Sequence, residues 1–430
     1  MGSSLNYMYS DSEKKNMQVR ILITILSFCY LSGSAQNVTS PYSILGIGDI
    51  DTRDYSRYTG SGNAATGRRD DHTYNFSNPA SLSALPLKAM HLDVALRGRS
   101  SIFTLTSGDK TDLTKDLIIK RISIAFKPDK KTGVAMGLKP YSSVNFKFSA
   151  EAKILDGNTT YSKFTEGTGG INQFYLSAGR SLGKHLSAGI TASWLFGSLQ
   201  RSVNYYSDVI SLDITRTDHD FYTGAMLQAG LQYYTASARK WKHTFGMTGS
   251  ISTGLSGQLS SEYSESGTVI TNSITNGRRF KLPASATVGY SAVHAEKLTL
   301  SAEASYSDWH YQKLAFKNSF TAPAWRLGAG LEYSFRRKSW AGLLEKSYVA
   351  LGFNTERSYL RVNNLPLNDH AFTFGAGFRP TGSVSVYSGL EFGVKGGGNS
   401  GLIKENYTQY VMGITVKDIW VGTKKFGRFN

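Results

Sequence analysis

The chain is poor in cysteine and in long apolar runs. It has 430 residues and one cysteine, Cys29. A disulfide within the chain needs two cysteines, so none braces the fold, and a metal site built from several thiolates is excluded as well. A membrane-spanning helix needs about 20 consecutive apolar residues, whereas the apolar run from Ile21 to Leu31 is shorter. These absences exclude a disulfide-stapled domain and a helical membrane protein.

Acidic residues are also scarce, since 31 Asp and Glu face 48 Lys and Arg and the net charge is +17. Such a balance is typical of nucleic-acid binding, but here the basic residues occur in short clusters. In the strand layout given below, every cluster lies on the same side of a membrane. Lipid headgroups, an anionic partner or a merely solvated rim each explain this. The clusters are Lys127, Lys130 and Lys131; Arg239, Lys240 and Lys242; Arg336, Arg337 and Lys338; and Lys424, Lys425 and Arg428.

The start of the chain carries an export signal. Arg20 precedes the apolar run, and Gly33, Ser34 and Ala35 follow it with small side chains. This order is typical of a signal peptide cleaved after Ala35. We therefore predict that residues 1–35 are an N-terminal extension and signal peptide, with Met1 or Met17 as the start. A lipoprotein signal at Cys29 is disfavoured because Phe28 is bulky where a small residue is needed.

Beyond residue 85 apolar and polar residues alternate. The clearest case places Val386, Leu390, Phe392 and Val394 on one face of a strand and Glu391 on the other. Side chains of a strand point to opposite faces in turn. In lipid, only a closed sheet satisfies every backbone group in such strands. The alternation therefore predicts an all-β protein, a closed antiparallel transmembrane β-barrel.

Alternation and turn residues together predict about 14 strands. Short connections alternate with long ones, which include residues 149–170 and a loop of about 28 residues before Leu282. Known outer-membrane barrels have short periplasmic turns, so we expect both termini in the periplasm, a barrel over residues 87–421 and a periplasmic tail over 422–430. The second expected strand carries Ile122, Ile124 and Phe126 on its apolar face. The others lie near residues 92–103, 134–148, 174–182, 186–199, 221–234, 244–253, 282–291, 298–308, 324–335, 348–354, 371–379, 384–395 and 407–420.

The segment of residues 36–86 does not alternate and is rich in Gly, Asn, Asp and Ser. A barrel of this size leaks unless its interior is filled. Apolar residues such as Tyr42, Ile47 and Leu82 give the segment material to pack. We expect an N-terminal hatch or plug inside the barrel, with a dangling periplasmic segment as the alternative.

Several short motifs resemble the long-chain fatty acid transporter (FadL/TodX) family. Asn78-Pro79-Ala80 in the expected plug is similar to an element of that family's hatch, and Leu282-Pro283-Ala284-Ser285 is similar to one of its strand starts. Asp308-Trp309 resembles its acidic-aromatic pair. The motifs follow the family's order over nearly the whole mature chain. The resemblance implies a divergent branch with 14 strands behind an inserted hatch.

The resemblance also implies a mechanism, in which a hydrophobic ligand enters from the outer loops and leaves after the hatch shifts. Asn78, Pro79 and Ala80 would form the hatch hinge, because proline fixes φ and asparagine bonds nearby backbone. An ordinary Asn-Pro turn is the alternative. Pro140 is a candidate strand kink that opens a lateral gap in the wall, although a simple bulge also explains a proline there.

By the alternation, Glu303 and Glu391 point to the lumen. They line a polar route, or they are neutralised by arginines of the lumen. The alternative is a structural salt bridge to the plug. No catalytic motif, metal-ligand pattern or cofactor motif is found, so we expect no enzyme, no cofactor and no metal. The alternative to a protein without catalytic activity is a lipase or protease whose site is assembled from distant strands.

The sequence thus predicts a bacterial outer-membrane channel for passive uptake of hydrophobic or amphipathic small molecules. The alternative is a non-transporting barrel that acts as a scaffold or partner in a secretion or assembly complex. Expected partners are outer-membrane lipid, a hydrophobic small-molecule ligand and a protein at the outer loops or periplasmic turns, but no nucleic acid. A secreted β-sandwich is the remaining structural alternative; it would bury the apolar strand faces against a second sheet.

Overall fold

The computed structural model describes residues 40–70, 73–104, 111–153, 160–207, 212–235, 240–314, 318–339, 342–397 and 402–419. The chain divides into two units, Met1–Asn37 and Val38–Asn430, and the first lies outside the described residues. The predicted signal peptide and the predicted tail over 422–430 therefore also lie outside them.

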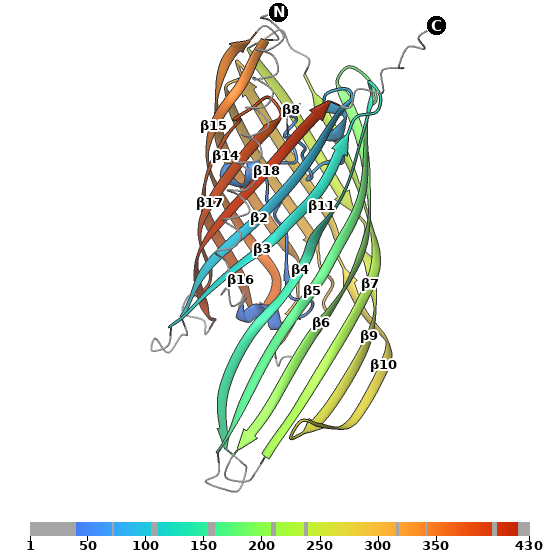
Figure 1. The fold of residues 1–430 in the computed structure, drawn as a ribbon, viewed down its shortest axis with the longest axis vertical. Helices are drawn as coiled ribbons and strands as arrows, with labels where there is room; N and C mark the ends of the chain where they lie inside the picture. Colours follow the sequence, from blue (N-terminus) through green and yellow to red (C-terminus); the bar gives the residue numbers. More distant parts are fainter. Residues whose placement is uncertain are drawn as a thin grey trace, which may run out of the picture. The chain divides into compact units, whose positions relative to one another are not determined.

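Almost every element of the second unit is a β-strand, and the strands pair in antiparallel ladders from neighbour to neighbour (Figure 1). The last strand pairs with the first wall strand from Lys404↔Thr104 to Ile419↔Ala89, which closes the sheet. The wall strands are β2 (Ala89–Thr104), β3 (Thr111–Phe126), β4 (Thr132–Lys153), β5 (Thr160–Ser181), β6 (Leu186–Ser207), β7 (Leu212–Tyr234), β8 (Trp241–Ser250), β9 (Thr253–Glu265), β10 (Thr268–Leu282), β11 (Ala284–His294), β12 (Leu298–Asp308), β13 (Ser319–Thr321), β14 (Ala324–Ser339), β15 (Gly342–Val362), β16 (Leu365–Phe378), β17 (Val384–Gly396) and β18 (Lys404–Ile419).

Three wall strands are each interrupted once. β8 and β9 follow one another along the same neighbour, β7, and both β13 and β14 pair with β15. β10 and β11 are separated only by Pro283, which has no N–H to donate to a ladder. With these pairs joined, the wall is a closed antiparallel barrel of 14 strands, and the predicted fold is confirmed.

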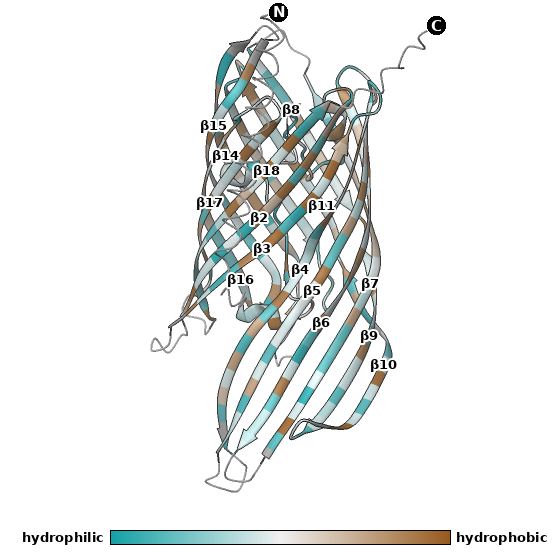
Figure 2. Ribbon diagram, viewed as in Figure 1, coloured by the Kyte–Doolittle hydropathy of each residue, from teal (hydrophilic) through white to brown (hydrophobic). Residues whose placement is uncertain are grey.

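The predicted alternation is visible on the barrel wall (Figure 2). On β17 the outward side chains Leu390, Phe392 and Val394 are 38–46% exposed, whereas Glu391 between them is fully buried. The apolar faces of the strands therefore point away from the barrel interior. A β-sandwich with a dry core between two sheets is excluded by this arrangement.

The prediction was wrong about the long connections at one end of the barrel. Residues 253–282 form the β9–β10 hairpin with a turn at Ser266 and Gly267, not a loop, and β4 and β5 extend to Lys153 and Thr160. Both faces of these extensions are rich in Ser, Thr and Asn, so they lack the apolar stripe that marks a strand. Their ladder hydrogen bonds keep them extended. We call this end of the barrel the hairpin end, and the end where β2 begins and β18 ends the turn end.

Residues 40–70 and 73–86, which we call the inner segment, lie inside the barrel (Figure 1). They include η1 (Pro41–Ile44), β1 (Asp49–Ile50), η2 (Arg57–Ser61) and η3 (Pro79–Ala84). The polar caps Ser40, Ser56 and Asn78 start the three 3-10 helices. Most of the segment is buried against the wall, so it occupies the lumen.

Within the described residues, no helix is both long and apolar enough to span a membrane.

Candidate functional site

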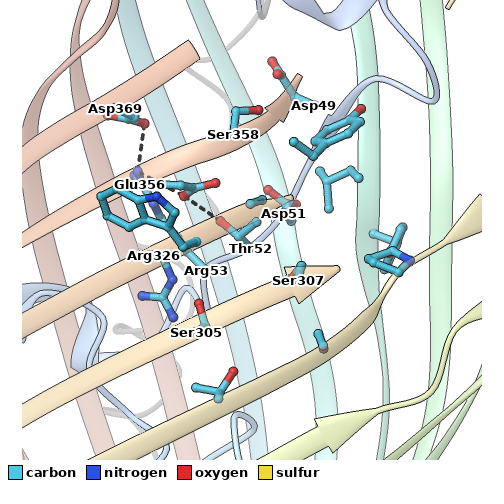
Figure 3. Close-up of a pocket in the computed structure, with 18 of the residues that line it drawn as sticks. Asp49, Asp51, Thr52, Arg53, Ser305, Ser307, Arg326, Glu356, Ser358 and Asp369 are labelled. Carbon is cyan, nitrogen blue, oxygen red and sulfur yellow. Dashed lines mark hydrogen bonds and ion pairs between the residues drawn. The ribbon is translucent and has the colours of Figure 1, made fainter. Parts of the chain in front are cut away.

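Buried arginines tie the inner segment to the wall. The guanidinium of Arg53 bonds to Asp369 Oδ2 at 2.9 Å (Figure 3). It also bonds to Glu391 Oε1, and Tyr407 donates to the same two carboxylates. The side chains of Arg53 and Glu391 are 7% and 0% exposed. Because arginine stays charged and its planar fork matches carboxylates, such a pair fixes position as well as charge. Arg53 therefore holds the inner segment against β16 and β17.

A second clamp lies nearer the turn end. Arg57 donates to Glu332 Oε1 at 2.8 Å and to Glu345 Oε1 at 3.2 Å, and Arg68 donates to the same Glu332 oxygen at 2.8 Å. The Arg57 guanidinium also stacks on the Tyr348 ring at 4.1 Å. Two arginines of the inner segment thus neutralise two carboxylates of β14 and β15.

The predicted lumen residues Glu303 and Glu391 both lie inside the barrel. Glu391 contacts Arg53, as described, and accepts a hydrogen bond from Gln409 at 3.0 Å. Glu303 contacts Arg326 of the neighbouring strand and accepts the backbone amides of Ala65 and Thr66 at 2.9 and 2.7 Å. Both carboxylates therefore bind the inner segment, one through a side chain and one through its backbone.

Glycines of the wall let the inner-segment backbone approach closely. A Cβ atom on Gly179 of β5 would lie 2.1 Å from the Pro79 carbonyl oxygen, and one on Gly375 of β16 would lie 2.8 Å from the Gly60 Cα. Atoms this close must move apart. The lumen is consequently packed to the backbone at these points, with no space for a passing molecule between segment and wall.

Asn78, Pro79 and Ala80, the predicted hinge, begin η3. The Asn78 side chain accepts the Ala80 amide at 3.0 Å and donates to the carbonyls of Thr66 and Leu231 at 3.2 and 3.0 Å. It therefore caps the 3-10 helix and also joins two inner-segment turns to β7. A movement at this point would break all of these bonds.

Pro140 lies in β4 at an irregularity of the ladder to β5, between Pro140 and Ser142. On the other side of β4, the described ladder to β3 covers Ile122–Phe126 and Val134–Leu138 and ends there. β1 takes over beyond Pro140, with Asp49 and Ile50 opposite Ser143 and Ser142. The proline thus marks the point where the neighbour of β4 changes from a wall strand to the inner segment.

Ion pairs join the inner segment to β3 at the same level. A bulge in the β2–β3 ladder turns both Lys120 and Arg121 into the barrel, where each is 2% exposed. Lys120 binds Asp51 at 2.7 Å and Arg121 binds Asp54 at 2.7 Å. The inner segment therefore spans the interval between β3 and β4, bonded to both.

An apolar cluster fills the hairpin end of the lumen. Tyr42, Leu45 and Ile47 of the inner segment pack there against lumen side chains of the wall. The cluster includes Trp309, which stacks on Tyr359 with ring centroids 4.4 Å apart and is 5% exposed. Trp309 is thus a core residue, not part of an external aromatic belt. The protein's own side chains occupy the apolar part of the lumen.

A cavity of about 300 Å³ lies between this cluster and the arginine clamps (Figure 3). Charged and polar side chains line it together with apolar ones such as Met226, Trp309 and Trp325. Thr52 donates to Glu356 there at 2.9 Å, and Lys395 contacts Asp49 at 3.0 Å. Charges of both signs pair across the cavity, so its charged part suits water and small polar solutes.

We did not predict the cationic half of this site from the sequence; it consists of Arg53, Arg57, Arg68, Lys120 and Arg121. A signal for it was present, since several basic residues lie in a segment expected to fill the lumen, and lumen-phase acids such as Glu332 and Asp369 lie on the strands. Within the described ranges, no cluster of His, Cys, Asp or Glu is arranged to hold a metal ion. The described chemistry of the lumen is ion pairing and packing.

Solved outer-membrane structures share this fold. A Pseudomonas aeruginosa FadL homologue matches with a TM-score of 0.62 and 11% identity, over 87% of this chain and 100% of that chain. The Pseudomonas putida toluene transporter TodX matches with 0.57 and 14%, over 86% and 100%. The CymD monoaromatic hydrocarbon channel matches with 0.53 and 12%, over 79% and 91%. The predicted resemblance to the FadL/TodX fold is thereby confirmed.

Among curated proteins, none matches this sequence significantly. The family model described as BamG matches residues 17–427, nearly the whole chain. A match of this extent covers the inner segment and all wall strands together. The chain therefore belongs to the BamG family.

Proposed function

We propose that this protein is an outer-membrane barrel with a closed lumen that acts as a scaffold or partner in a secretion or assembly complex. The observation that carries the proposal is the packing of the inner segment, which binds the wall through buried ion pairs and backbone contacts at several levels. Membership of the BamG family favours the same function.

The energetics of the ion pairs support a closed lumen. Removing one partner from a buried pair costs about 3–5 kcal/mol. A hatch that moved aside would separate Arg53, Arg57 and Arg121 from their carboxylates at once. At about 3–5 kcal/mol for each pair, opening on that scale would cost about 9–15 kcal/mol, which is comparable with the whole stability of a domain, about 5–15 kcal/mol. We infer that residues 36–86 stay in place as a permanent plug.

The surface for a partner is provided by the projecting hairpins. The β9–β10 hairpin exposes Val269, Ile270 and Ile274 by 53–63% among polar neighbours. Apolar side chains on an otherwise polar projection are typical of a protein contact. This hairpin is the face on which we expect a partner to dock.

Passive uptake of a hydrophobic small molecule is the second candidate function. It is favoured by the fold shared with hydrocarbon channels and by the change of neighbour of β4 at Pro140. In that mechanism Asn78, Pro79 and Ala80 would be the hinge, and the polar cavity would lie on the route. The charged lining and the filled apolar cluster weigh against it.

We further propose that the signal of residues 1–35 directs export and that the turn end faces the periplasm. Residues 87–421 would then form the barrel in the outer membrane, and both termini would lie in the periplasm. The short turns at the turn end support this orientation, because known outer-membrane barrels have short turns on the periplasmic side.

Two measurements test the proposal. In planar bilayers the wild-type protein should show no stable conductance, whereas deletion of residues 40–86 should open a large pore. Proteoliposomes should take up toluene or a fatty acid no faster than protein-free vesicles. Uptake well above that background, lost when the lumen is blocked, would favour the transporter instead.

The partner is sought with a photo-crosslinking amino acid at Ile270 or Ile274 in living cells. A discrete protein adduct is expected there but not with the same probe at Lys130, an exposed turn residue. Leu259 and Thr275 are paired across the hairpin. A variant that lacks residues 260–274, so that Leu259 is followed directly by Thr275, should fold normally and lose the adduct. Absence of an adduct at both hairpin positions would contradict docking at this face.

A further inference from the structure

An open apolar groove of about 780 Å³ lies on the outer face of the wall. Its lining runs from Leu186 of β6 across β7, β8 and β11 to Leu327 of β14, and we call the small outward side chains Ala302 and Ala304 of β12 its floor. Val288 and Leu327 are 52% and 47% exposed, so they stand above the floor. The groove exists because β12 presents two small side chains between strands with large ones.

The ladder register gives the width of the groove where it crosses β12. Tyr290 lies opposite Ala302, and Val288 lies opposite Ala304, which in turn lies opposite Leu327. Neighbouring strands are about 4.8 Å apart, so Val288 of β11 and Leu327 of β14, on either side of the floor, are separated by roughly 10 Å. That width admits one extended hydrocarbon chain lying along β12.

A polar layer covers the turn end of the groove. The Tyr290 hydroxyl lies 2.7 Å from His243 Nδ1, and the Trp241 ring packs on His294 with centroids 4.6 Å apart. His294 follows Tyr290 by four residues, which is about 13 Å along a strand. Aromatic and amphipathic rings of this kind favour the headgroup level of a bilayer. The groove floor therefore lies at the depth of acyl chains just below the headgroups.

Cationic side chains surround the same end. Glu296 accepts from Lys242 at 2.8 Å and lies 3.5 Å from Arg336, and the bond from Lys242 lowers its pKa. This one carboxylate does not balance the cations around it, so the rim is positive. The cationic residues on the described part of the rim are Lys240, Lys242, Lys297, Arg336 and Arg337.

We propose that this groove binds one anionic glycerophospholipid from the leaflet at the turn end. One acyl chain lies on Ala302 and Ala304, and the phosphate meets the cationic rim beside Trp241 and His294. The positive rim favours an anionic lipid over an apolar protein surface as the occupant of the groove. An apolar protein surface would leave these cations without a counter-ion. The proposal requires only that the barrel lies in a membrane, so it stands apart from the scaffold function.

The test uses native mass spectrometry of the full-length protein in detergent with phosphatidylglycerol or phosphatidylcholine of identical acyl chains. Wild type should retain one phosphatidylglycerol more strongly than phosphatidylcholine. A304W fills the groove and should lose this preference, and the milder A302L/A304L should weaken it. The matched control is A376W, an outward-facing alanine of β16 away from the groove.

The rim is tested by K240Q/K242Q/K297Q against K130Q/K131Q, which removes cations at the same end far from the groove. Each lysine near an anionic lipid surface contributes about 1 kcal/mol to the binding free energy, or about fivefold in affinity. The triple variant should therefore bind phosphatidylglycerol at least about tenfold more weakly than wild type. The control pair should bind it as wild type does.

Two results would overturn the proposal. Equal retention of phosphatidylglycerol by wild type and A304W would mean that the lipid binds elsewhere. A photo-crosslinker at Ala304 that captures a discrete protein in membranes, in place of lipid, would mean that this face is a protein contact.

Discussion

Arg53→Met is the sharpest test of how the inner segment is held. Methionine keeps much of the length of arginine and removes the charge and all five donors. In the variant, Asp369 and the fully buried Glu391 lose the cation that they share with Glu356. The described hydrogen bonds that remain are those from Tyr407 to both carboxylates and from Gln409 to Glu391. Two neighbouring carboxylates would then compete for these neutral donors.

The expected loss in the free energy of unfolding is about 3–5 kcal/mol, the cost of breaking a buried pair by removing one partner. Glu391→Gln in the same background removes one of the two orphaned charges. The double variant should therefore lose less than the sum of the single losses, with a coupling of about 1–3 kcal/mol. R216M is the matched control, because its 3.0 Å pair with Asp218 is solvent-exposed and should contribute about 0–1 kcal/mol.

The assay is urea unfolding in lipid vesicles, followed by tryptophan fluorescence and by mobility on unheated SDS gels. Limited proteolysis within residues 40–86 should be faster in R53M than in wild type. If R53M were no less stable than R216M, or if the two substitutions were additive, the clamp would not hold the inner segment and the reasoning would fail.

Two further predictions concern packing and pH. Gly179→Ala places a methyl group 2.1 Å from the Pro79 carbonyl oxygen. It should lower the free energy of unfolding by about 1–3 kcal/mol, measured by thermal unfolding. The control is Gly183→Ala, because a Cβ atom there meets nothing within 4 Å. Asp129 accepts the amides of Lys131 and Thr132 at 2.7 and 2.8 Å, bonds that lower its pKa. Its stabilising effect should be present above an unfolded pKa of about 3.9 and be lost as pH falls through the lower folded pKa. An NMR titration of this carboxyl with a midpoint at or above the unfolded value would contradict it.

Much of the wall could be predicted because alternation is a local property of the sequence. Val386, Leu390, Phe392 and Val394 mark their strand without any knowledge of its neighbours, since lipid demands one apolar face. The same rule explains the error at residues 253–282. Outside lipid, neither face of β9 or β10 must be apolar, so the pattern vanishes although the ladder continues.

The lumen was less predictable because its contacts join residues far apart in the chain. Glu391 could be assigned to the inward face from its place in the alternating pattern. Its partner Arg53 is 338 residues away in the chain, and nothing in the local sequence specifies that pairing. The bulge that turns both Lys120 and Arg121 inward breaks the very alternation on which the prediction relies. Residues such as Asn78 could be identified as a turn, while the bond to Leu231 depends on the complete fold.

The position of the inner segment immediately before β2 imposes an order on folding. β2 is one side of the seam with β18, the pairing that closes the barrel. Once that seam is complete, a segment bonded to both β3 and β4 has no wide opening through which to enter. Protection of residues 40–86 from a protease pulse should therefore arise no later than closure of the seam, and a late entry would show that the wall can reopen.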